Sequence, residues 1–145
     1  MRPQQNGNGI GEVAAAGDGA SPPRRRAHGL LASFYFAFAG LAFLFKTQRN
    51  ARIELAIGAL ACALGAWLRV SRAEWAVLVF TIALVLILEG LNTAVEAAID
   101  LASPQVHPLA KAAKDLAAGM VLIAAIASVA VGLLILGPPL WAKLH

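Results

Sequence analysis

Long runs of apolar residues constrain the fold of this chain more than any other feature of its sequence. The three clearest runs cover residues 53–70, 75–95 and 116–136, and each has about the 20 residues that a helix needs to cross a bilayer core. The chain is 59% apolar and only 14% charged over 145 residues. A soluble chain of this size leaves about a third of its surface exposed, so it could not hide that excess. The sequence therefore predicts an all-α integral membrane protein.

A fourth apolar run, at about 28–48, differs from the others because aromatic residues crowd it and basic clusters flank both ends. Arg24–Arg26 precede it, and Lys46, Arg49 and Arg52 follow its apolar part. A membrane span here would place one of the two basic clusters on the outer side. We therefore expect an amphipathic helix on the membrane surface, followed by three transmembrane helices.

The rest of the chain predicts one domain with a tail. Residues 1–27 are rich in Gly, Pro, Gln, Asn and Ala and end in arginines, which is typical of a disordered segment. Residues 28–145 form the membrane domain. We expect connections at 70–74 and 97–115, and we expect Gly137, Pro138 and Pro139 to end the last span.

The basic residues predict the orientation in the membrane. Three spans place eight of them on one side and three on the other, which makes the first side cytoplasmic by the positive-inside rule. The eight are Arg24, Arg25, Arg26, Lys46, Arg49, Arg52, Lys111 and Lys114, and the three are Arg69, Arg72 and Lys143. They flank the apolar runs instead of forming a basic stripe with interleaved aromatics, so the net charge of +4 does not indicate a nucleic-acid partner.

A polar stripe enters the second span at its cytoplasmic end. At 100° per residue its members fall on one side of a helix, and they are Glu89, Asn92, Thr93, Glu96 and Asp100. Carboxylates inside a membrane are costly and usually face a bundle interior or a polar cavity, which marks this stripe as a candidate functional site. An ordinary solvated helix end is the other interpretation, and it suits Asp100 best.

A second group of charged residues precedes the third span on the same side of the membrane. Lys111, Lys114 and Asp115 share a helical face, so opposite charges converge near the stripe. Ion pairs with anchoring lysines would explain them equally well. His107 stands beside Pro108, and a turn residue is a better interpretation for it than a metal ligand.

Carboxylates and lysines together suit a metal–nucleotide complex, because acids bind divalent cations and lysines bind phosphate. Phosphoryl transfer needs these groups and a carboxylate that accepts the proton of the attacking hydroxyl. The chain has neither GxxxxGK[ST] nor GxGxxG, so a nucleotide site would be of another kind. A small multi-pass transporter and a non-enzymatic membrane scaffold remain as alternatives.

The segments from Glu89 to Asp100 and from His107 to Gly119 resemble the prokaryotic diacylglycerol kinase and undecaprenol kinase family, over about residues 30–136. The resemblance implies three transmembrane helices, a surface helix, and a homotrimer with composite active sites. It also implies magnesium- and ATP-dependent phosphorylation of a lipid alcohol, diacylglycerol or undecaprenol, at the cytoplasmic face of the bacterial inner membrane.

The same resemblance implies roles for single residues. Glu89 is expected as the catalytic base and Glu96 as a metal ligand, with Asn92 holding the site. Lys114 and Asp115 match nucleotide-contacting positions. The sequence departs from the family pattern at Gln48, which stands where an acidic metal ligand is usual. Gln48 is a possible ligand without charge, and Glu54, about two turns on, is the alternative.

Overall fold

The computed structural model describes residues 29–103 and 107–145, and within these ranges all regular structure is helical. The predicted tail at 1–27 lies outside the described residues. Four helices follow one another along the chain: α1 (Gly29–Thr47), α2 (Arg49–Leu68), α3 (Arg72–Ala102) and α4 (Pro108–Leu144). The all-helical prediction is confirmed.

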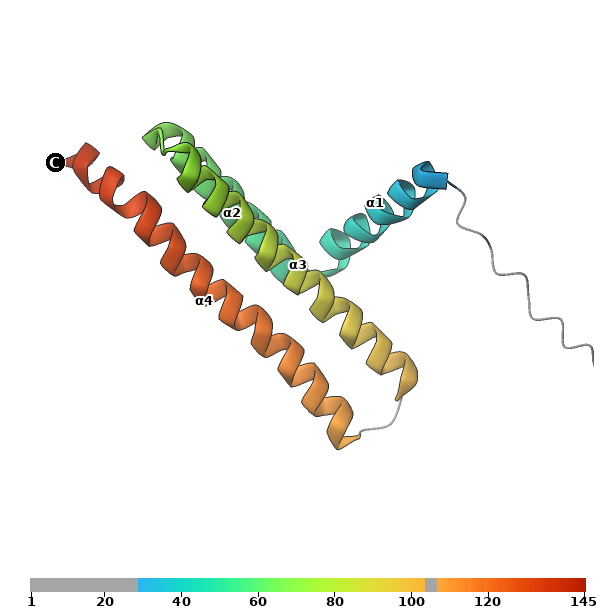
Figure 1. Ribbon diagram of the computed structural model, residues 1–145. Helices are drawn as coiled ribbons and strands as arrows, with labels where there is room; N and C mark the ends of the chain where they lie inside the picture. Colours follow the sequence, from blue (N-terminus) through green and yellow to red (C-terminus); the bar gives the residue numbers. More distant parts are fainter. Residues whose placement is uncertain (1–28, 104–106) are drawn as a thin grey trace, which may run out of the picture.

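Three of the helices form a bundle and the fourth departs from it. Helices α2, α3 and α4 lie side by side, and α3 shares its most extensive contact with α4. Helix α1 leaves this bundle at a steep angle (Figure 1). The start of α2 lies alongside the middle of α3, so the end of α3 and the beginning of α4 extend beyond it. This extension carries the polar stripe.

The turn between α2 and α3 is built from local hydrogen bonds. Arg69 adopts the left-handed conformation (φ 57°), and the N–H groups of Arg69 and Val70 donate to carbonyls in the last turn of α2. Ser71 then caps α3, because its Oγ accepts from the N–H of Glu74 at 3.3 Å and its own N–H donates to the Glu74 carboxylate at 2.6 Å. The chain therefore reverses within three residues.

The connection predicted at 97–115 is wrong, because the observed connection is much shorter. Helix α3 continues to Ala102, and α4 already begins at Pro108. His107 caps α4 through its Nδ1, which accepts from the N–H of Leu109 at 3.2 Å, so its interpretation as a turn residue is confirmed. The predicted connection is rich in Glu, Lys and Ala, which favour the helical state, so its polarity does not end a helix. Pro108 can begin α4, because the first helical position does not need a backbone N–H.

The prediction that Gly137, Pro138 and Pro139 end the last span is also wrong, because α4 runs through both prolines to Leu144. Proline fixes φ near the helical value, so it costs the helix a hydrogen bond without forcing a turn. Membrane helices tolerate such losses better than soluble ones do.

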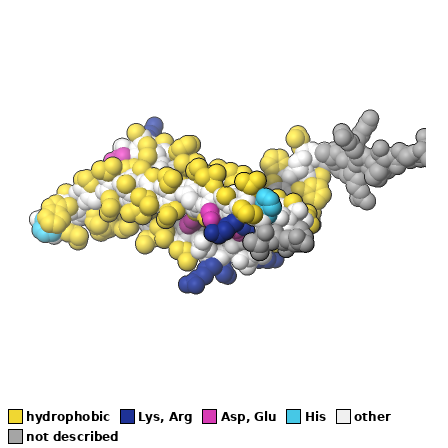
Figure 2. Space-filling view, turned by 90° about the horizontal axis from the view of Figure 1, so that it is seen from below, with side chains coloured by type: hydrophobic (Ala, Val, Ile, Leu, Met, Phe, Trp, Pro, Cys, Tyr) yellow, Lys and Arg dark blue, Asp and Glu magenta, His cyan; other side chains and the backbone are white. Residues whose placement is uncertain are grey.

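Few side chains are buried within a single chain. Leu44, Ala51, Leu78, Val85, Ala124 and Leu136 are the buried apolar residues among those described. The surface is largely apolar (Figure 2), as expected for a protein that faces lipid or other copies of itself. The described residues form four helices that are long and apolar enough to cross a membrane. Large apolar residues of α1 are exposed on several sides, so its assignment as an amphipathic surface helix stays a prediction.

Close packing between α2 and α3 depends on glycine. A Cβ atom added at Gly58 would lie 2.8 Å from Cγ2 of Ile82, a distance that real contacts do not reach. At the far end of the bundle, Lys143 donates to the carbonyl of Trp67 at 3.0 Å, and its Nζ lies 4.2 Å from the centre of the Trp67 ring. These contacts join α2 to α3 and to the end of α4.

Candidate functional site

The polar stripe predicted from the sequence lies on α3, and its first members are the most enclosed. Glu89 is only 3% exposed and Thr93 is 9% exposed. The Thr93 hydroxyl donates to the backbone carbonyl of Glu89 at 2.9 Å. No described residue donates a hydrogen bond to the Glu89 carboxylate. A buried carboxylate with free acceptor oxygens can accept a hydrogen bond, and then a proton, from a ligand hydroxyl.

The next turn of α3 couples two further members of the stripe. The side-chain amide of Asn92 donates to Glu96 Oε1 at 3.3 Å. The amide oxygen of Asn92 is buried and has no hydrogen-bond partner in the part of the chain that the structure describes. Glu89 and Glu96 are seven residues apart, or about 10 Å along the helix axis, with Asn92 between them. The stripe is therefore a row of acceptor oxygens along one side of α3.

The charged end of the site joins α3 to α4. Lys114 of α4 forms an ion pair with Asp100 of α3, which confirms that opposite charges of the two segments converge. Lys111 and Asp115 pair with each other along α4 at 3.7 Å, and both are largely exposed. Figure 2 shows basic and acidic side chains side by side on a surface that is otherwise mostly apolar. This end can offer an ammonium group to a phosphate.

The two alternative metal ligands lie about two turns apart, Gln48 just before α2 and Glu54 within it. Gln48 precedes the helix as its cap residue, and its side chain makes no capping hydrogen bond. Glu54 lines a small cavity of about 110 Å³ between α2, α3 and α4. One Glu54 carboxylate oxygen is buried, and no described residue is its hydrogen-bond partner. Sequence reasoning underrated Glu54, although a carboxylate between Ile53 and Leu55 in an apolar helix was a signal of enclosure.

The donor set fits a magnesium ion only in part. No three His, Cys, Asp or Glu side chains among residues 29–103 and 107–145 come together as a metal site. Magnesium, however, is usually held by one or two carboxylates together with substrate phosphates. Glu96 and the unpartnered oxygen of Asn92 are oxygen donors of the right kind. These two residues fit a metal that arrives with a nucleotide, and no complete protein cage is present in the described chain.

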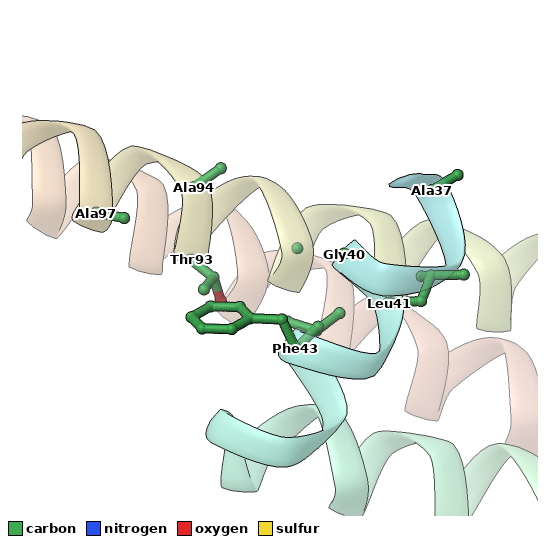
Figure 3. A pocket seen from close by; sticks show the side chains of 9 residues that line it. Ala37, Gly40, Leu41, Phe43, Thr93, Ala94 and Ala97 are labelled. Carbon is green, nitrogen blue, oxygen red and sulfur yellow. The ribbon is translucent and has the colours of Figure 1, made fainter. Parts of the chain in front are cut away.

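A pocket of about 560 Å³ lies between α1 and α3. Helix α1 supplies Ala37, Gly40, Leu41, Phe43 and Leu44, and α3 supplies Gly90, Thr93, Ala94 and Ala97. Figure 3 shows the Phe43 ring next to Thr93, with small side chains along the adjoining part of α3. The sequence did not predict this pocket, because its walls come from segments about fifty residues apart. Its size is in the range of small-molecule sites.

Comparison with known proteins identifies relatives over most of the chain. Residues 35–136 match the family model for prokaryotic diacylglycerol kinase. The chain is 47% identical over 134 residues to the diacylglycerol kinase of Synechocystis sp., which covers 88% of this chain and 77% of the relative. It is 40% identical over 108 residues to the undecaprenol kinase of Bacillus subtilis, covering 74% and 88%. The diacylglycerol kinase of Escherichia coli strain K12 is 33% identical over 94 residues, covering 65% and 77%.

Proposed function

The chain belongs to the prokaryotic diacylglycerol kinase family and is a lipid kinase, and we propose that it phosphorylates a membrane lipid alcohol with magnesium and ATP. We place the reaction at the cytoplasmic face of the bacterial inner membrane. The observation that carries this proposal is the enclosure of Glu89 on a helix long enough to cross a membrane. Asp100, further along the same side of this helix, forms an ion pair with Lys114. Family membership favours this function over a transporter or a scaffold.

In the proposed reaction Glu89 is the general base. The lipid hydroxyl donates a hydrogen bond to the Glu89 carboxylate, and its oxygen attacks the γ-phosphorus of ATP. The hydroxyl proton passes to Glu89 as the bond from the γ-phosphorus to the β–γ bridging oxygen breaks and ADP leaves. Among residues 29–103 and 107–145 no side chain or backbone group donates to this carboxylate, which supports the role because its oxygens are available to the substrate.

The neighbouring residues bind and orient the nucleotide in this proposal. Asn92 holds Glu96 through the 3.3 Å hydrogen bond. Glu96 would hold magnesium, with the Asn92 oxygen and Gln48 as further oxygen ligands. The metal, when bound, neutralises phosphate charge. Lys114 supplies a positive charge to the phosphates. To do so, its ammonium group must either contact Asp100 and the phosphates together or leave its ion pair with Asp100. Asp115 completes the nucleotide contacts from the first turns of α4.

We also propose a homotrimer in which three helices of each protomer span the membrane and α1 lies on its surface. Two observations support this arrangement. The angle of α1 to the bundle separates it from the three packed helices, and most apolar side chains remain exposed in a single chain. Other copies of the chain would cover part of this apolar surface and complete the active sites.

The proposal is tested by assaying the purified full-length protein in lipid–detergent micelles with labelled ATP. We expect label to enter an added lipid alcohol, and we expect the transfer to stop when a chelator removes magnesium and to resume when magnesium is returned. Hydrolysis of ATP without any labelled lipid, for every alcohol supplied, would contradict the proposal.

A further inference from the structure

The small cavity between α2, α3 and α4 has two polar residues in its lining. Glu54 of α2 and Ser128 of α4 line it from different helices, and its volume is about 110 Å³. The rest of the lining is apolar and consists of Ile57, Ile82, Val85, Ala125 and Val129. One water molecule needs about 10–15 Å³ of such space, whereas sites for drug-sized ligands begin at about 300 Å³. The cavity therefore suits only very small ligands.

Both polar residues present hydrogen-bond acceptors to a ligand. Glu54 Oε2 is buried, and no described residue donates to it. The Ser128 hydroxyl donates its proton to the carbonyl of Ala125 at 2.8 Å, so only its lone pairs are left. The other lining side chains carry no polar hydrogen. Because a buried acceptor without a donor is costly, a ligand that donates would stabilise this site.

No described basic residue neutralises the Glu54 carboxylate. The ion pairs within the described part of the chain join Lys111 to Asp115 and Lys114 to Asp100. Burying a charge without a partner costs more than burying a neutral polar group, and a hydrogen bond to a charged group is about twice as strong as one between neutral groups. Donation to Glu54 would therefore contribute more than donation to Ser128.

Loose packing of the helices does not explain the cavity. Gly58 lies one turn after Glu54 on α2, and a Cβ atom there would lie 2.8 Å from Cγ2 of Ile82. Ile82 also lines the cavity, so α2 and α3 are in close contact directly beside it. A cavity with purely apolar walls stays dry. Glu54 and Ser128 give this one the two polar partners that a bound water molecule needs.

From these observations we infer that the cavity binds water, with one molecule donating to Glu54 Oε2 and to the Ser128 hydroxyl oxygen. Water is small and has two donor hydrogens, so it can join two acceptors that lack a donor between them. This bridge links α2 to α4 and holds the Glu54 carboxylate inside the bundle. It therefore favours Gln48 over Glu54 as the metal ligand. The inference concerns the bundle itself and stands whichever lipid the kinase phosphorylates.

Removing one partner at a time tests the bridge. Ser128→Ala deletes one acceptor and should lower the thermal unfolding midpoint of the full-length protein in detergent micelles by about 2–8 °C. In a Glu54→Leu background the same substitution should have little effect, because no bridge remains to be broken. Equal shifts in the two backgrounds would overturn the inference.

Filling the cavity gives a test that keeps both partners. Ala125→Val adds two methyl groups to the lining, and expulsion of the water would leave Glu54 without a donor, so the unfolding midpoint should fall. Ala127→Val is the matched control, because Ala127 is exposed on the same helix and lies outside the lining, and its midpoint should stay at the wild-type value. In a dry cavity the added methyl groups would gain contacts. A midpoint of Ala125→Val at or above that of the wild type would therefore contradict bound water.

A crystal structure of the full-length protein grown in a lipid mesophase provides the direct test. We expect a solvent peak within hydrogen-bond distance of both Glu54 Oε2 and Ser128 Oγ. We also expect the stability difference between wild type and Ser128→Ala to persist when choline replaces sodium and a chelator removes divalent ions. A cavity without a solvent peak would overturn the inference. A stability difference that disappears without metal ions would do so too, because the ligand would then be a cation.

Discussion

Helix α3 meets α2 and α1 in two different ways. Against α2 the approach is so close that a single added carbon at Gly58 would lie 2.8 Å from Ile82, whereas against α1 a pocket of about 560 Å³ remains. The first contact holds α2 and α3 together, and the second leaves room beside Gly90 and Thr93. One helix thus packs tightly on one side and borders a pocket on another, so substitutions in the two regions should have separable effects.

The largest effect is expected from Glu89→Gln, which removes the proposed base and keeps nearly the same shape. Loss of general base catalysis should lower kcat by about 10²- to 10⁴-fold. The unfolding transition in a denaturing detergent should stay close to that of the wild type, since no described residue donates to this carboxylate. Full turnover by a folded Glu89→Gln protein would remove Glu89 from the mechanism.

Lys114→Met should have the next largest effect. Loss of one charge-assisted hydrogen bond to a phosphate should lower kcat/KM for ATP by about 10- to 100-fold. Asp100→Asn is the matched control, because it breaks the same ion pair but keeps the ammonium group. If both variants lose ATP affinity to the same degree, the ion pair matters and the proposed phosphate contact does not exist.

Gly58→Leu tests the other side of the comparison. The larger side chain must displace Ile82, and overpacking of this kind costs about 1–3 kcal/mol. Detergent-induced unfolding should therefore occur at lower denaturant, while activity per folded molecule is kept. Gly132→Leu, which adds the same group in open space, should unfold like the wild type. Equal stability of the two variants would show that α2 and α3 are not tightly packed.

Gln48→Glu should produce a smaller change, and in the direction of gain. A carboxylate in place of the amide adds negative charge to the proposed metal site, so the magnesium concentration for half-maximal activity should fall several-fold. The readout is a magnesium titration at saturating ATP. An unchanged titration would indicate that Gln48 is not a ligand. Glu54, the alternative ligand, would then be substituted and tested by the same magnesium titration.

Lys143→Met should have the smallest effect, because Lys143 lies far from the site, at the end of the bundle where α4 contacts Trp67 of α2. Loss of the contact with the exposed Trp67 ring should lower the free energy of unfolding by about 0.5–1 kcal/mol. Kinase activity should be unaffected. A marked loss of activity in this variant would mean that the two regions are coupled through α4.

Local spacing was enough to predict the helices and the polar stripe. Glu89, Asn92, Thr93 and Glu96 recur at intervals of three and four residues, and this interval alone places them on one side of α3. The approach of Lys114 to Asp100 followed from short connections between apolar runs. These features depend on neighbours in the sequence, which the sequence shows directly.

Features that depend on distant contacts could not be predicted in the same way. The ends of α3 at Ala102 and of α4 at Leu144 were missed for a separate, local reason, because the prediction gave polarity and proline more weight than helical preference. The pocket is lined by residues of both α1 and α3, among them Gly40 and Gly90, and no periodic pattern relates the two segments. The orientation of Glu54 depends in the same way on how α2 packs in the bundle.

The position of the pocket between α1 and α3, outside the three-helix bundle, has a consequence for kinetics. If the lipid acceptor of the proposed reaction binds there, it reaches the pocket sideways from the bilayer, and the concentration that matters is its mole fraction among the surrounding lipids. Adding inert lipid or detergent should slow the reaction by dilution within the surface, even when the amounts of enzyme and acceptor per volume stay the same. Encounter between enzyme and acceptor is then a two-dimensional process, and only ATP arrives from three dimensions.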